Sequence, residues 1–145
     1  MKKSSFATVL ALLLAGSTAA IAGSAGTISV PVSGLKNDAG VVRCGLFSSA
    51  ATFRQPGAQM KGSVAKISGE SANCSFSGVP AGTYAVAVFH AENNETTLQT
   101  GTFGKPKEGY GFSRNAGGMF GPPSFEEAAI AFDGSKASWP VHLRY

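Results

Sequence analysis

Apolar side chains recur at every second position along most of this chain, and this spacing constrains the fold more than any other feature. The segment 27–33 alternates polar and apolar residues, and the segment 139–145 repeats the alternation near the other end. A period of two places the apolar side chains of an extended strand on one face, whereas an amphipathic helix needs spacings of three and four. The sequence therefore predicts an all-β fold.

Seven segments carry this alternation or a related apolar pattern. They are residues 27–33, 41–48, 62–68, 72–76, 83–90, 128–132 and 139–145. The segment 83–90 is apolar on both faces, which is typical of a central strand covered on both sides. Turn-forming residues separate the segments, and no long helical pattern lies between them. We therefore expect a single antiparallel β-sandwich of about seven strands over residues 23–145.

Local signals add three expectations about how these strands are connected. Residues 36–40 form a turn-rich connection, so we expect segments 27–33 and 41–48 to pair as a hairpin. Pro31 lacks a backbone donor, which predicts that its strand lies at a sheet edge. Residues 124–127 (Ser-Phe-Glu-Glu) match a helix capping box, but the alternation that follows at once is equally compatible with entry into a strand.

The first 22 residues have the organisation of a secretion signal. Lys2 and Lys3 precede an apolar stretch at 6–15, and the small-x-small pattern at 20–22 favours cleavage before Gly23. A second such pattern at 23–25 offers another cleavage point. The apolar stretch has about half of the ~20 residues that a membrane-spanning helix needs. We expect a periplasmic or secreted chain that does not span the membrane after cleavage.

Cys44 and Cys74 are the only cysteines, and each shares the apolar face of its alternating segment. An even pair in an exported protein is typically a disulfide, so we expect a bridge between two inward faces, with two buried free thiols as the alternative. A metal site is disfavoured because only His90 and His142 could complete it, and neither has a recognisable ligand spacing.

The charge pattern gives no support for nucleic acid as a partner, and we expect none. The formal net charge of +4 includes Lys2 and Lys3 of the signal, and the remaining basic residues are scattered along the chain. A nucleic-acid-binding protein concentrates its basic residues on one face or in one stripe.

The alternation stops over residues 91–123, where glycine, asparagine, proline and aromatic residues dominate. A loop of this length in a compact domain is usually functional or disordered. In the favoured interpretation, its aromatic residues cover the open end of the sandwich as a satellite core. In the other, the rings line a shallow cleft for a sugar, peptide or small anion. The candidate ligand-binding residues are His90, Lys107, Tyr110, Phe112 and Arg114.

The sequence offers no catalytic constellation. No Gly-x-Ser-x-Gly motif is present, and Glu108, Glu126 and Glu127 fit solvated surface glutamates better than an acid–base pair. We expect a non-enzymatic binding or structural module of the cell envelope, whose partner is an envelope protein or a small ligand. An uncharacterised hydrolase is the less favoured alternative.

Three stretches resemble the family of small exported bacterial proteins known as domain of unknown function 2141 (DUF2141). They are 90–95 (His-Ala-Glu-Asn-Asn-Glu), 103–113 (Phe-Gly-Lys-Pro-Lys-Glu-Gly-Tyr-Gly-Phe-Ser) and 121–128 (Gly-Pro-Pro-Ser-Phe-Glu-Glu-Ala). The turn and strand at 78–85 are also similar to those of the family. The resemblance implies a seven-stranded sandwich of the transthyretin-like or carboxypeptidase-regulatory type, with no established activity.

The resemblance also raises the question of calcium. In the family, the strand-ending histidine is followed by an acidic, asparagine-rich loop that looks like a calcium loop. Here two of its carboxylates are replaced by Ala91 and Gln99. The remaining oxygen donors form a weakened calcium-like remnant: Glu92, Asn93, Asn94 and Glu95. We expect a polar turn here rather than a cation site, and therefore no cofactor.

Overall fold

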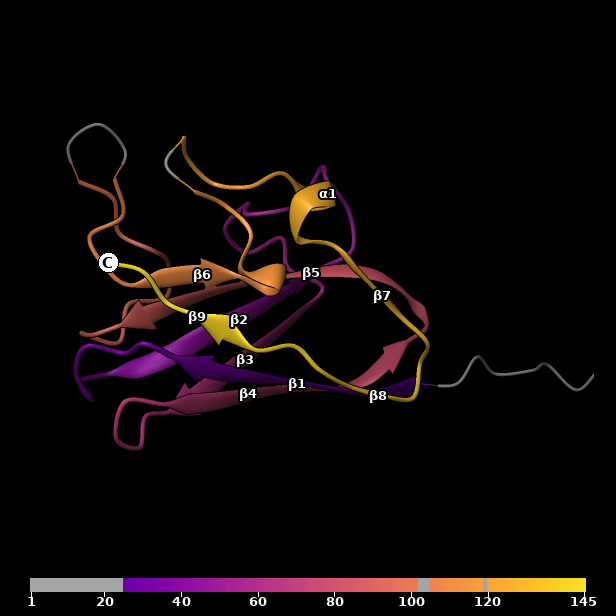
Figure 1. The fold of residues 1–145 in the computed structure, drawn as a ribbon, viewed down its shortest axis with the longest axis horizontal. Coiled ribbons are helices and arrows are strands. Elements are labelled where there is room, and N and C mark those ends of the chain that lie inside the picture. The colour runs from indigo at the N-terminus through magenta and orange to yellow at the C-terminus, as the bar shows by residue number, and fades with distance from the viewer. Residues whose placement is uncertain (1–24, 102–104, 119) are drawn as a thin grey trace, which may run out of the picture.

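The computed structural model describes residues 25–101, 105–118 and 120–145, and within them the chain forms two β-sheets packed face to face (Figure 1). The strands are β1 (Ala25–Ser33), β2 (Val41–Phe47), β3 (Lys61–Lys66), β4 (Ala72–Pro80), β5 (Gly82–Ala91), β6 (Tyr110–Phe112), β7 (Ile130–Phe132), β8 (Lys136–Ser138) and β9 (Val141–His142). The short helices are η2 (Ser113–Asn115) and α1 (Phe125–Ala128). The predicted all-β sandwich is confirmed. The predicted signal peptide, residues 1–22, lies outside the described residues.

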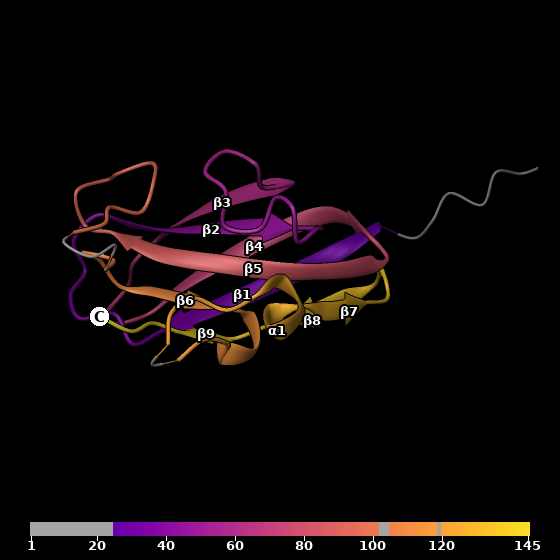
Figure 2. The same ribbon diagram turned by 90° about the horizontal axis from the view of Figure 1, so that it is seen from above.

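The two sheets differ in strand order and direction. One sheet has the order β4-β1-β8, with β9 also beside β1, and the other has the order β3-β2-β5-β6, with β7 also beside β5 (Figure 2). β1 runs parallel to β8 and β9, whereas the remaining pairs are antiparallel. We call them the four-stranded and five-stranded sheets. None of the helices in the described residues is long and apolar enough to cross a bilayer.

The predicted hairpin between residues 27–33 and 41–48 is wrong. β1 belongs to the four-stranded sheet and β2 to the five-stranded sheet, so the turn at 34–40 crosses between them. Alternation determines which face of a strand is buried but not which strand lies beside it. The apolar faces of β1 and β2 both enter the same core, and they meet across it.

The prediction that Pro31 marks a sheet edge is also wrong, because β1 lies between β4 and the β8–β9 segment. Ser29 pairs with Ser138 and Val32 with Val141, and the same register places Pro31 opposite Pro140, between β8 and β9. Neither proline has a backbone donor. The ladder is therefore interrupted where neither residue could have donated a hydrogen bond.

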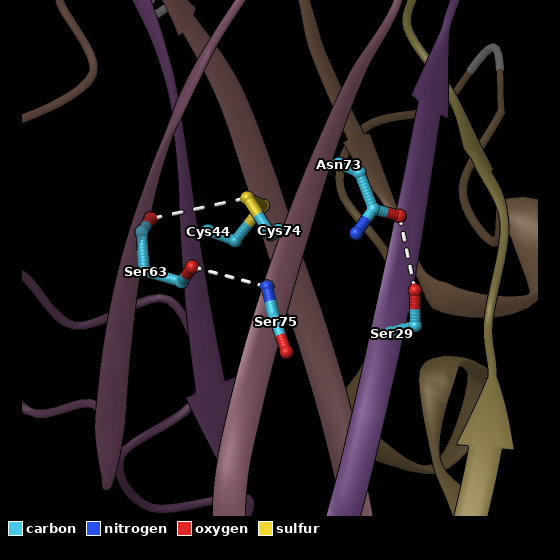
Figure 3. The surroundings of a disulfide bond; sticks show 6 residues. All are labelled: Ser29, Cys44, Ser63, Asn73, Cys74 and Ser75. Carbon is cyan, nitrogen blue, oxygen red and sulfur yellow. Dashed lines mark hydrogen bonds between the residues drawn. A yellow bond between two sulfur atoms is a disulfide. The ribbon is translucent and has the colours of Figure 1, made fainter.

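The predicted disulfide joins the sheets through the core. Cys44 on β2 and Cys74 on β4 are bonded, with 6.4 Å between their Cα atoms (Figure 3). Nearby, the Ser75 amide donates to Ser63 Oγ at 3.1 Å, which links edge strands β4 and β3 of the two sheets. Cys74 Sγ lies 3.9 Å from the Ser63 carbonyl oxygen. Covalent and polar contacts thus fasten the sandwich along this side.

A second, aromatic core lies on the outer face of the five-stranded sheet. Its buried members are Phe47, Phe53, Ala85, Phe112 and Ala128, with Tyr110, Ala87, Ala116 and Phe125 packed against them. The Phe53 ring makes edge contacts with three other phenylalanines at centroid distances of 5.5–5.9 Å. The predicted satellite core is therefore present in part: it contains Phe112 with Tyr110 and Phe125 packed against it, but Phe120 is fully exposed, and the core covers the outside of a sheet rather than the open end of the sandwich.

The segment 91–123 is more ordered than its composition predicts. It contains β6 and η2, and the capping box at Ser124 then starts α1, with Ser124 and Glu127 each accepting a hydrogen bond from the other's amide. The helical alternative at 124–127 is thus correct, and strand β7 follows it.

Candidate functional site

A group of side-chain hydrogen bonds lies at the end of the sandwich where β5 ends, near the C-terminus (Figure 1). His90, the penultimate residue of β5, is fully buried. Its Nε2 lies 2.7 Å from the Ala39 carbonyl oxygen, and its Nδ1 lies 2.7 Å from Tyr145 Oη. A carbonyl oxygen only accepts, so Nε2 carries the hydrogen and, in the neutral ring, Nδ1 accepts from the tyrosine hydroxyl. Both ring nitrogens are therefore used within the protein.

Tyr145 closes this end over the 34–40 turn. Its hydroxyl accepts from the Lys36 amide at 3.2 Å, and the Lys36 ammonium lies 4.9 Å from the centre of its ring. A Cβ atom at Gly109 would collide with that ring, so a larger residue there would displace the Tyr145 side chain. Desolvation raises the pKa of the Tyr145 phenol above its ordinary value.

Glu92 is the carboxylate paired with this turn. Asn37 Nδ2 donates to Glu92 Oε1 at 2.7 Å, and Lys36 Nζ lies 3.5 Å from the same oxygen. The Asn37 hydrogen bond is the main reason that the pKa of Glu92 is lowered, with a further contribution from Lys36. Glu92 thus holds the 34–40 turn to the end of β5.

Glu95 and Glu108 form a second, different arrangement. Glu108 is only 5% exposed, and its Oε2 is buried with no hydrogen-bond partner among the described residues. Its carboxyl group contacts that of Glu95, whose Oε2 accepts from the Asn93 amide at 3.1 Å. Desolvation is the main cause that raises the pKa of Glu108 to about 7, and the contact with Glu95 adds to it. At Glu95, desolvation raises the pKa, but hydrogen bonds from its own backbone and from Glu108 outweigh this effect, so the pKa of Glu95 is lowered.

The five candidate ligand-binding residues do not converge. His90 points into the core, whereas Tyr110 and Phe112 lie on the outer face of the five-stranded sheet, in and beside the aromatic core. Lys107 and Arg114 are exposed. Beside β6, a hollow of only about 10 Å³ is bordered by Tyr110 and Phe112, which is space for about one water molecule. Among the described residues, the five candidate side chains therefore do not line one common hollow.

The outer face of the five-stranded sheet carries a partly exposed row that continues from the aromatic core. Arg43 lies opposite both Val64 and Phe89, and Phe89 lies opposite Tyr110. We call Val64, Arg43, Phe89 and Tyr110 the outer strip. Val64 is 57% exposed, and Arg43 Nε is buried with no hydrogen-bond partner among the described residues. The strip thus combines apolar, aromatic and cationic groups on one face of the sheet.

The fold also brings together a serine and a histidine that the sequence did not connect. Ser33 Oγ lies 3.1 Å from His142 Nδ1 on the exposed face of the four-stranded sheet, because β1 and β9 run side by side. A nucleophilic serine needs a base that a third group orients. The described residues supply no carboxylate hydrogen bond to His142, whose ring instead packs against Gly34. The pair is a surface contact between two strands.

Sequence analysis missed the role of Glu108, which it placed among solvated glutamates. Glu108 is buried because the chain joins the five-stranded sheet at β6, two residues later. No periodic apolar pattern surrounds Glu108 in the sequence. The calcium-like remnant is a turn at the end of β5, with Asn94 in left-handed conformation at φ 61°. No three His, Cys, Asp or Glu side chains converge as a metal site in the described part of the chain.

Comparisons with known proteins identify a family but no activity. The DUF2141 family, described as an uncharacterised protein conserved in bacteria, matches residues 30–139. No curated protein matches the chain. Among solved structures, the pilus-presented adhesin Spy0125 (Cpa) is similar at 8% identity and a TM-score of 0.27. That similarity covers 83% of this chain and only 27% of the adhesin.

Proposed function

Because the chain belongs to the bacterial DUF2141 family, whose members are uncharacterised, we propose from its own geometry that it is an exported, non-enzymatic module that binds a protein of the cell envelope. The observation that carries this proposal is the outer strip. Aromatic side chains and arginine are enriched in protein interfaces, and they dominate binding energy where water is excluded. The strip offers aromatic side chains and an arginine on the outer face of the five-stranded sheet.

Arg43 gives the strip its expected selectivity. Its Nε has no partner among the described residues, and its side chain lies between Val64 and Phe89. The Arg43 side chain as a whole is partly exposed, so its guanidinium can pair with a carboxylate of a partner, and a charge-assisted hydrogen bond is stronger than a neutral one. The partner surface should therefore be apolar with at least one acidic group.

The Cys44–Cys74 bridge supports the export part of the proposal. Disulfides persist in oxidising compartments such as the periplasm and the medium, and they are rare in the cytosol. The expected signal peptide at 1–22 would deliver the chain there.

Site-specific photo-crosslinking in living cells tests the binding proposal. A photoreactive amino acid at Val64 should capture an envelope protein, and the same group at Ser77, an exposed position of β4 on the other sheet, should capture much less. Arg43→Ala combined with the Val64 probe should reduce the captured amount at least tenfold. Equal capture from both positions, or capture indifferent to Arg43→Ala, would contradict a specific interface on the strip.

The small-ligand alternative is tested separately by thermal shifts with panels of sugars, peptides and anions. The hollow next to Tyr110 admits about one water molecule, so we expect no shift that depends on Tyr110 or Phe112. A shift abolished by Arg114→Ala would favour ligand binding by the 91–123 segment instead.

A further inference from the structure

An open groove of about 490 Å³ lies over the outer face of the four-stranded sheet, where β1 ends. One side is bordered by the turn between β3 and β4, in which Ser68 and Ser71 pair as an isolated bridge. The other side is bordered by Pro140, between β8 and β9. Small-ligand sites have volumes of about 300–1,000 Å³. This groove is therefore large enough for a ligand, whereas the hollow of about 10 Å³ beside Tyr110 is not.

The floor of the groove is rigid and largely apolar. Pro31 lies at its centre, with Asn73 of β4 opposite it on one side and Pro140 on the other. All three residues are exposed. Neighbouring strands lie about 4.8 Å apart, so the row is about 10 Å long. A proline ring loses no rotamer freedom when it is covered, so the two rings form a platform on which a ligand can pack at low entropic cost.

Hydrogen-bond donors stand on both sides of this platform. Asn73 Oδ1 accepts from Ser29 Oγ at 3.0 Å, which orients the amide (Figure 3). Asn73 Nδ2 then has no partner among the described residues. On the other side, Ser71 Oγ donates to the Ser68 carbonyl oxygen at 3.2 Å, and the Ser68 hydroxyl is free of contacts with any residue that the structure describes. The groove thus offers an oriented amide donor and a hydroxyl to a ligand.

The charge of the groove is positive. Lys66 is the charged residue that borders it, and its ammonium forms no ion pair within the described ranges. Strands β1, β4, β8 and β9 of this sheet contain no aspartate or glutamate. Glu70 lies at the exposed tip of the 68–71 turn, outside the lining. A cleft lined by charge of one sign concentrates ligands of the opposite sign, so the ligand should be anionic.

We propose that this groove binds a short stretch of an acidic polysaccharide. A sugar residue would lay the apolar face of its ring on Pro31 and Pro140. Its hydroxyl groups would accept hydrogen bonds from Asn73 Nδ2 and from Ser68. A carboxylate or phosphate on the glycan would pair with Lys66, a flexible point charge that suits either group. A mostly apolar surface with a few directed polar groups is the usual composition of a ligand site.

The position of the groove favours a sugar over a peptide. Peptides bind sheets mainly by adding a strand to a free edge, but β1 has neighbouring strands on both sides. Neither Pro31 nor Pro140 has a backbone donor that a peptide could use. The inference does not depend on the outer strip, which lies on the other sheet. With both surfaces occupied, the sandwich would join an envelope protein on one sheet to an acidic glycan on the other.

NMR titration of the isotope-labelled, oxidised protein with oligogalacturonate, a uronic-acid oligomer, tests the groove. The amides of Val32, Ser68 and Asn73 should shift and saturate, whereas those of the outer strip should not shift. Glucose 6-phosphate is the phosphate arm, and the anion with the smaller Kd identifies the preferred charged group. A neutral malto-oligosaccharide should bind about tenfold more weakly than the preferred anion, because it lacks the charge-assisted contact with Lys66.

Two variants and a matched control distinguish the groove from general attraction of anions. Lys66→Gln should weaken binding about tenfold or more, and Asn73→Ala should weaken it severalfold. Both residues are exposed, so the variants should fold as the natural chain does. Lys105→Gln removes the same charge from an exposed residue before β6 and should leave the affinity unchanged.

Three results would overturn the proposal. The first is that neither anionic sugar shifts the groove amides. The second is that Lys66→Gln and Lys105→Gln bind equally well, which would mean that only net charge matters. The third is that an oligoglutamate peptide binds more tightly than both sugars, which would make the groove a site for acidic peptides.

Discussion

Ser113 shows how much one buried hydroxyl can contribute to this sheet. β6 pairs with residues 87–89 of β5 and β7 pairs with residues 82–84. Between them, the Val86 amide donates to Ser113 Oγ at 2.9 Å, and Ser113 Oγ donates to the Ala128 carbonyl oxygen at 2.6 Å. One side chain thus satisfies a donor and an acceptor that the interrupted ladder leaves unpaired.

We predict that Ser113→Ala lowers the free energy of unfolding by about 2–4 kcal/mol, because it leaves two buried backbone groups unsatisfied. Urea unfolding followed by tryptophan fluorescence measures this, since Trp139 is buried in the main core. Ser77→Ala, at an exposed position, is the matched control and should change stability by less than about 0.5 kcal/mol. Equal stability of the two variants would contradict the bridging role.

Glu108 makes the stability of the protein depend on pH. Its pKa is raised from 4.5 to about 7 in the folded state, so between these values the native state keeps a proton that the unfolded state has lost. The free energy of unfolding therefore falls as pH rises through this window, by at most about 3 kcal/mol. The pKa values of Glu92 and Glu95 are lowered from 4.5, so these two groups change the free energy of unfolding only below this pH window.

We predict that Glu108→Gln removes this pH dependence. Urea unfolding at pH 5 and pH 8 with a chelator should show a marked loss for the natural chain and little loss for the variant. The variant should be the more stable protein at pH 8. If both proteins lose the same free energy of unfolding between pH 5 and pH 8, Glu108 has an ordinary pKa in the folded state.

Neither Ser113 nor Glu108 could be recognised from the sequence. Both lie in the stretch where the apolar alternation stops, so no pattern distinguishes a buried polar residue from a solvated one there. Their burial depends on how the chain returns to β5 after residues 105–107, which pair with residues 99–101. This is tertiary information that local composition does not contain.

At the scale of the strands, the sequence predicted correctly which face of a strand is buried, but not which strands lie side by side. The inward faces of β1, β2 and β4 match the alternation, and the disulfide follows from two such faces meeting. Pairing depends on turn geometry and on which sheet each strand enters. The alternation is the same whether two consecutive strands pair in one sheet or lie in different sheets. For this reason the Cys44–Cys74 bridge was predictable, whereas the crossing at residues 34–40 was not.

The bridge should be a major contributor to stability because it links strands of different sheets across a sequence separation of 30 residues. We predict that the Cys44→Ala/Cys74→Ala double variant loses about 3–4 kcal/mol in the free energy of unfolding, from the chain-entropy estimate for a loop of this size. Reductant should lower the stability of the natural chain but leave the double variant unchanged. A reductant effect on the double variant would point to another cause.

Phe53 was outside every predicted strand, yet it is the centre of the second core. It is 5% exposed and packs its ring edge-to-face with Phe47, Phe112 and Phe125. A lone aromatic residue in a turn-rich segment gives no periodic signal, so its burial could not be predicted. The core forms because the 48–60 connection and α1 close over the same sheet face from opposite directions in the chain.

We predict that Phe53→Ala lowers the free energy of unfolding by about 3–5 kcal/mol, as for other buried phenylalanines. Phe120→Ala is the control, because Phe120 is 101% exposed and should contribute little. Thermal and urea unfolding of the two variants give the comparison. Similar stabilities would mean that the second core adds no net stability to the sheet.

At the scale of the whole molecule, the two sheets are joined along both long sides. On one side, the disulfide and the Ser63–Ser75 contact connect β3 with β4. On the other, Tyr110 of β6 exchanges two backbone hydrogen bonds of 2.9 Å with Arg144 after β9. The final segment thus contributes contacts to both sheets, and Tyr145 adds its hydrogen bonds to His90 and to the Lys36 amide.

The expected signal peptide and the Cys44–Cys74 bridge together predict that the chain is oxidised after export. We expect the chain recovered from the cell envelope to begin at Gly23, by intact mass, and its two cysteines to resist alkylation until reduced. A version that starts at Gly23 after an initiator methionine should remain in the cytoplasm with alkylatable thiols, and should unfold at the lower urea concentration of the double cysteine variant. Export without cleavage would contradict the signal interpretation, whereas a fully oxidised cytoplasmic form would separate the disulfide from the compartment.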